Sequence, residues 1–160
     1  METNPIIPID EMTGQDEADT RLLREMFERA ESYVKSLEWC TPITERFFGY
    51  GIGGIIAVFF FKFATKINGT DDRLWVVVGD VPSAYLVTDN ALNPAAALSL
   101  YCDMMEAWAT AVLNRTPLDV VFPITAEPTA EHANMLLSRI TFIREKIIPA
   151  CHLKSARSGT

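Results

Sequence analysis

The stretch FFGYGIGGIIAVFFFKF, Phe47 to Phe63, constrains the fold of this chain more than any other feature. It contains four glycines, and it has no charged residue from Phe47 to Phe61. Three structures suit such a stretch: a membrane-spanning helix, a glycine loop that binds a nucleotide, or a buried strand with its connection. The residues within and around the stretch discriminate among them.

A membrane-spanning helix is the first alternative. Such a helix needs about 20 apolar residues to cross the ~30 Å hydrocarbon core. The uncharged run is shorter than that, because Lys62 closes it. Glycines and a crowd of β-branched and aromatic residues also disfavour any helix. The sequence therefore argues against a membrane span.

A nucleotide-binding loop is the second alternative. The residues from Gly49 to Gly54 satisfy G-x-G-x-x-G, and Asp71 or Asp72 follows at almost the distance of a ribose-binding acid. That loop requires a strand before the glycines and a helix after them. Here a β-rich segment follows the glycines and a helical or irregular one precedes them. The sequence favours a flexible glycine connection that leads into a buried strand.

This buried strand is predicted from Ile55 to Thr65. Both faces of its first half, before Lys62, are apolar, which is typical of a strand between two layers. One face carries Ile55, Ala57, Phe59, Phe61 and Phe63, and the other carries Ile56, Val58 and Phe60. Further strands are predicted at Leu74–Val78 and Ser83–Thr88, with turns at Asn68-Gly69 and between Gly79 and Pro82. Such short links predict a three-stranded antiparallel meander.

Three main amphipathic helices are expected beside this sheet. The first spans Glu17–Trp39, the second begins at the cap Asn93 with Pro94 in its first turn, and the third runs from the cap Thr129 to before Pro149. A short helix is also expected within TPITERFFGYG, residues 41–51. The prediction is an α+β fold in the order α-β-β-β-α-α. It places one domain at 16–149 between flexible segments at 1–15 and 150–160.

The composition limits the classes of partner. The chain has 21 acidic and 14 basic residues and a net charge of −7, so nucleic acid and anionic membranes are disfavoured partners. Cys40, Cys102 and Cys151 are widely spaced and form no zinc motif, which fits a reducing compartment. The first residues show no secretory signal. We expect a cytoplasmic protein.

Groups with catalytic chemistry are few. His132 and the adjacent Cys151-His152 pair lack partners at triad or metal spacing, and Asp103 with Glu106 is better explained as a solvated helix face than as a metal site. We therefore assign no catalytic residue, no metal and no cofactor.

Four residues are the candidates for a pocket or an interaction surface, because they lie at the glycine segment and at predicted turns. They are Tyr50, Gly51, Asp80 and Asp89.

The block WVVVGDVPSAYLVTDNALNPAAALSLYCDMMEAWATAV, Trp75 to Val112, resembles a family of small uncharacterised bacterial proteins with a domain of unknown function. This resemblance covers about a quarter of the chain. It implies no catalytic residue and no ligand.

Three functional classes follow from these observations. The first is a small acidic interaction module, of the immunity or antidote type, that binds a basic protein. The second is a homodimeric domain that binds a small ligand, because three helices leave part of an apolar sheet for a second copy to cover. The third and least favoured is an enzyme with a cleft near Gly49–Gly54.

Overall fold

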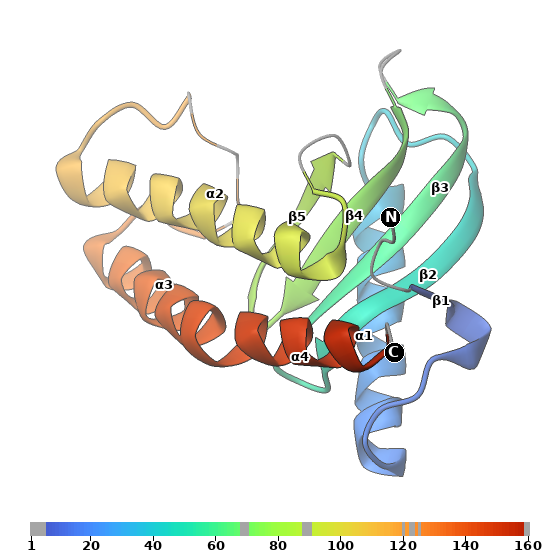
Figure 1. Cartoon of the computed structure of the whole chain (residues 1–160). Helices are drawn as coiled ribbons and strands as arrows, with labels where there is room; N and C mark the ends of the chain where they lie inside the picture. The colour runs from blue at the N-terminus through green and yellow to red at the C-terminus, as the bar shows by residue number, and fades with distance from the viewer. Residues whose placement is uncertain are drawn as a thin grey trace.

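The computed structural model describes residues 6–67, 71–87, 91–119, 121, 124 and 126–158. They form a five-stranded antiparallel sheet between helices (Figure 1). The α+β class is confirmed, whereas the prediction of three strands is wrong. The strands lie side by side in chain order: β1 (Ile7–Pro8), β2 (Ile43–Ile52), β3 (Ile56–Ile67), β4 (Asp71–Gly79) and β5 (Val81–Val87).

Strand β2 replaces the short helix expected at residues 41–51. Thr41, Pro42 and Gly51 resemble a helix cap, first turn and end, but the residues between them include isoleucine, threonine and consecutive phenylalanines, which suit a pleated surface. β2 pairs antiparallel with β3 from Ile43 to Ile52. This pairing outweighs the weak local helix signals, because tertiary contacts routinely override propensity.

The N-terminal segment contributes the fifth strand. Ile7 and Pro8 of β1 pair with Phe48 and Phe47 of β2, and the 3₁₀ turn η1 (Ile9–Glu11) follows. Met12 is fully buried. The described part of residues 1–15 thus packs onto the domain, whereas the sequence suggested a separate flexible segment.

Helices cover both faces of the sheet, with α1 (Glu17–Lys35) behind it and the later helices in front (Figure 1). Phe59 and Phe61 of β3 lie in the core on the α1 side. Val58 and Phe60 lie in a second core with α2 (Pro94–Asn114) and α3 (Ala130–Phe142). The prediction of a strand apolar on both faces is confirmed. Because one chain buries the side chains of both faces, the uncovered face that suggested a homodimer is not found among the described residues.

The predicted caps position the helices. The Asn93 side chain accepts the N–H of Ala96 at the start of α2, and Thr129 accepts the N–H of His132 at the start of α3. Each cap satisfies one N–H group that has no partner within the helix. The predicted turn residues Asn68 and Gly69 lie outside the described residues, although β3 and β4 pair antiparallel on either side of them.

The last helix continues past Pro149, where the sequence predicted its end. α3 is followed without a break by the π-helical segment η3 (Ile143–Ile147) and by α4 (Ile148–Ser158). The N–H of Ile148 donates to the carbonyl of Ile143, five residues earlier. In a regular α-helix the ring of Pro149 would crowd the preceding turn, and the wider π-helical turn lies at this point of the helix. Cys151, expected in a flexible tail, is therefore helical and buried.

Candidate functional site

An open cleft of about 490 Å³ lies where the last residues of β2, Tyr50 to Ile52, meet α1 and α4. We call it the edge cleft. Its fourth wall is the segment Thr13–Gln15 before α1, which we call the strap. The residues that matter for its chemistry are Gln15, Asp19, Tyr50, Gly51, Ile52 and Leu153.

Asp19 joins the walls of the edge cleft. One carboxylate oxygen, Oδ1, accepts the N–H of Gly53 at 2.7 Å, and Oδ2 accepts the N–H of Gln15 at 2.8 Å. The backbone N–H of Asp19 donates in turn to the helix cap Asp16 at 2.8 Å. A single carboxylate thus fixes the strap and the β2–β3 hairpin to the first turn of α1. Hydrogen bonds to a charged acceptor are the stronger kind.

The glycine segment allows α1 to approach this hairpin. A Cβ on Gly51 would lie 2.8 Å from the Cβ of Ala57 and 2.9 Å from Leu23, and one on Gly53 would lie 2.7 Å from Asp19. Gly54 has φ +81° at the hairpin turn. The glycines therefore belong to β2 and its hairpin, not to a flexible connection. No helix follows them to present its N-terminus to a phosphate.

Tyr50 lies on the cleft wall formed by β2. Burial raises the pKa of Tyr50, and neighbouring Cys151 and Asp19 raise it further. The Tyr50 side chain is therefore a neutral phenol at physiological pH and not a phenolate. This wall is suited to hydrogen bonding and packing.

The four candidate residues from the sequence do not form one site. Tyr50 and Gly51 both line the edge cleft. Asp80 lies instead at the β4–β5 turn, where its carboxylate binds Arg139 of α3 at 3.1 Å. Asp89 lies outside the described residues.

The residues of the edge cleft that were missed in the sequence include Gln15, Asp19 and Leu153. Gln15 and Leu153 fall in the segments that were expected to be flexible. Asp19 falls in the first turn of the predicted helix, where an acidic residue is common and signals only a helix start. Leu153 is the most informative of them, since this leucine is 62% exposed at the mouth of the cleft.

Acidic residues flank the strap on both sides. Residues 6–20 contain five acidic residues and no lysine or arginine. Four of these acidic side chains are exposed, and we call them the acidic flank: Asp10, Glu11, Asp16 and Glu17. Arg21 and Arg24 line a neighbouring hollow together with Asp16 and Glu17, so these two acids have basic residues close by.

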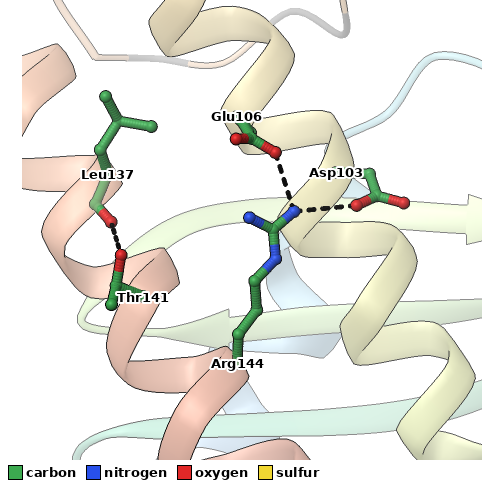
Figure 2. A network of polar contacts seen from close by, with 5 residues as sticks. All are labelled: Asp103, Glu106, Leu137, Thr141 and Arg144. Carbon is green, nitrogen blue, oxygen red and sulfur yellow. Dashed lines mark hydrogen bonds and ion pairs between the residues drawn. The ribbon is translucent and has the colours of Figure 1, made fainter.

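Asp103 and Glu106, three residues apart on α2, bind an arginine. Figure 2 shows the Arg144 guanidinium between them, and its Nη2 lies 2.9 Å from an oxygen of each. The hydrogen bond to Glu106 is the main cause that raises the pKa of Arg144. Within the described part of the chain, no group of three metal-ligating side chains is found.

The remaining nucleophiles and bases lie apart. Cys151 is buried on α4, whereas the adjacent His152 is exposed, so the two side chains point to different surroundings. His132 lies 2.8 Å from the Thr129 hydroxyl at the start of α3. Cys151 and His152 therefore do not face the same surroundings, and His132 lies at a helix start beside a threonine hydroxyl.

No known protein family matches this chain, and neither does any curated protein or solved structure. The likeness of Trp75–Val112 to uncharacterised bacterial proteins stays a prediction; that block forms most of β4 with β5 and α2. In the described residues, no helix has the length and apolar character that a membrane crossing requires.

Proposed function

We propose that this chain is a protein-interaction module that binds a basic segment of a partner in the edge cleft. An immunity or antidote protein that masks a basic partner would act in this way. One observation carries the proposal: an open cleft with an exposed leucine lies beside residues 6–20, which contain five acidic residues and no basic one before Arg21 and Arg24. The net charge of −7 favours such a partner during diffusional encounter.

The test starts from a displayed library of random peptides of about ten residues, long enough to span a strand. Peptides selected by the protein should be rich in lysine and arginine. Their synthetic forms should bind several-fold more weakly at about 0.3 M salt than at low salt, because salt screens exposed charges.

Two pairs of substitutions locate the charge effect. Glu11→Gln with Glu17→Gln removes two charges from the acidic flank, and Glu38→Gln with Glu127→Gln removes two from other exposed positions. We expect about three- to tenfold weaker binding for the first pair and less than about twofold for the second. Equal effects would show that binding follows net charge and not this cleft. A library that yields no peptide above background would contradict the proposed function itself.

A homodimer that holds a small ligand is the second candidate. Met135 and Phe142 favour it, since these side chains lie seven residues apart on α3 and are 44% and 46% exposed. Residues at this spacing share one helix face. Light scattering should then give twice the 17.9 kDa of one chain, and Phe142→Asp should return the mass to 17.9 kDa.

We also propose that the protein works in a reducing compartment such as the cytoplasm. Among the described residues no disulfide forms: the Cys102 and Cys151 side chains are buried, and that of Cys40 is half-buried. Burial raises the pKa of Cys102 to about 11, which keeps this thiol protonated and unreactive. Thiol titration of freshly purified protein should therefore count three thiols after unfolding.

A further inference from the structure

One side of α3 carries large apolar side chains that are exposed. Met135 is 44% exposed and Phe142 is 46% exposed. Ser138, between them in the chain, is exposed as well. Residues at these spacings lie on one side of a helix. On the opposite side, Leu136 and Ile140 are buried in the core that α3 shares with α2, so the exposed side of α3 faces outward (Figure 1).

Two charges of opposite sign lie at the ends of this exposed side. Glu131 precedes Met135 by four residues, about one helical turn, and Lys146 of η3 follows Phe142 by four residues. Both charged side chains are exposed. Neither of them forms an ion pair with another described residue. We call Glu131, Met135, Ser138, Phe142 and Lys146 the α3 stripe.

The spacing of the α3 stripe is the same from either end. Its two charged and two apolar residues are separated by four, seven and four positions. Two copies of a helix that pack antiparallel around a twofold axis bring residues at equal distances from the axis together. With the axis between Ser138 and Arg139, Met135 meets Phe142 of the second copy, and Glu131 meets Lys146 of the second copy. A parallel pair would instead bring Glu131 to Glu131.

The other charges of the helix also fit the antiparallel register. Glu145, which is exposed beside Lys146, comes opposite His132 of the second copy. Arg139 comes opposite a serine, and its guanidinium already binds Asp80 of its own chain. From residue 131 to residue 146, no two residues of like charge come opposite each other. Like charges placed opposite each other would select against such a pair.

Resting on the second candidate function, a homodimer, we infer that two copies of this chain pair through their α3 stripes in antiparallel orientation. The Met135 thioether of each copy packs on the Phe142 ring of the other, and the twofold axis repeats this contact. Ion pairs between Glu131 and Lys146 at both ends fix the register. This interface is small beside the about 1,600 Å² of a standard one, so we expect a dissociation constant of about 10–100 μM.

Charge reversal tests the register. Glu131→Lys and Lys146→Glu each place like charges at both ends of an antiparallel pair, so each should weaken dimerisation about tenfold in sedimentation equilibrium. The double variant, with both changes in one chain, restores opposite charges and the original net charge. It should dimerise within about twofold of the wild type. Both side chains are exposed, so all three variants should fold.

Two control variants separate the register from net charge. Glu38→Lys and Lys66→Glu make the same changes of charge at exposed positions outside α3, and each should alter the dissociation constant less than about twofold. Single stripe variants that weaken dimerisation no more than these controls would overturn the inference. A double variant as weak as the single ones would overturn the antiparallel register.

Cross-linking places the axis on α3. Ser138→Cys puts a thiol beside the twofold axis, within reach of its copy, and mild oxidation above the dissociation constant should give a disulfide dimer. Asn134→Cys is the matched control, since Asn134 is also exposed on α3. Its two copies would lie about 13 Å apart along an antiparallel helix pair, which is too far for a disulfide. Equal cross-linking of both variants would contradict this placement.

The outcomes separate the inference from the homodimer itself. A dimer whose dissociation constant is the same in the stripe variants and the wild type would overturn pairing through α3 and leave the homodimer candidate intact. A mass of 17.9 kDa at about 1 mM protein would overturn both, because that concentration is at least tenfold above the expected dissociation constant. No peptide is used, so these results do not depend on the edge cleft.

Discussion

Replacing Asp19 by alanine removes the carboxylate that joins α1, the strap and the β2–β3 hairpin. This carboxylate accepts the N–H groups of Gly53 at 2.7 Å and of Gln15 at 2.8 Å. Hydrogen bonds to a charged group contribute about 1.5–3 kcal/mol each, but water readily replaces the carboxylate at an exposed amide such as that of Gln15. Loss of the hydrogen bond to the Gly53 amide costs more free energy than loss of the one to Gln15, because the Gly53 amide is half-buried. We expect Asp19→Ala to lower the free energy of unfolding by about 2–3 kcal/mol.

Urea unfolding followed by circular dichroism measures this change. The slope of the unfolding free energy against urea concentration should stay the same if the fold is intact. Two matched variants bracket it. Asp10→Ala removes an exposed acid from η1 and should stay within about 0.5 kcal/mol, and Asp16→Ala removes only the helix cap and should cost about 1 kcal/mol. Asp19→Asn keeps one carbonyl acceptor and should fall between the alanine variant and the wild type. If Asp19→Ala costs no more than Asp10→Ala, the carboxylate does not fix these segments.

Three further predictions concern close packing, titration and a surface ion pair. Gly51→Ala should destabilise the protein by about 1–3 kcal/mol in the same assay, because its Cβ would lie 2.8 Å from the Cβ of Ala57. The pKa of Tyr33 is raised from 10.0 to about 12, mainly by burial and to a smaller extent by Tyr85. Its neutral form therefore stabilises the fold fully below pH 10, and this contribution is lost as the pH rises toward 12. Tyr33→Phe should reduce the loss of melting temperature over that window, and an identical pH profile would contradict this assignment. Arg144→Met should cost about 0.5–1 kcal/mol at low salt and less at high salt, in urea unfolding at two salt concentrations, and a cost that does not change with salt would contradict an electrostatic origin.

Local signals in the sequence were sufficient to predict β3, β4 and β5 and the starts of α2 and α3. Apolar runs between turn residues indicate the strands. The caps Asn93 and Thr129 accept N–H groups only three residues further along the chain, so their effect is local. β2 was missed because its evidence is not local. Its pairing with β3 and its contact with α1 decide its conformation, and neither can be read from residues 43–52 alone.

Two of the four candidate residues, Tyr50 and Gly51, line the edge cleft, and their role in binding stays a prediction. Tyr50 and Gly51 were found because a glycine segment permits close approach to a backbone. Asp19 contacts Gly53 across 34 positions of sequence, so its role appears only once α1 lies beside the hairpin. Leu153 follows Pro149, which usually ends a helix, and the π-helical segment η3 is what carries the helix past the proline to this cleft.

A variant of Asp19 affects both the stability of the fold and the proposed binding, whereas a variant of Leu153 should affect only the binding. This difference determines how the proposed function can be tested. Because Asp19 fixes the strap that forms one wall of the edge cleft, any variant of this residue changes both the fold and the cleft. Leu153 is largely exposed and contributes only the opposite wall. A ligand that binds only the folded state stabilises it by an amount that grows with its concentration relative to its dissociation constant. A selected peptide should therefore raise the melting temperature of the wild type and of a control variant, Leu92→Lys, at a leucine that is 72% exposed and does not line the cleft, but not of Leu153→Lys. Equal stabilisation of all three proteins would place the peptide elsewhere on the surface.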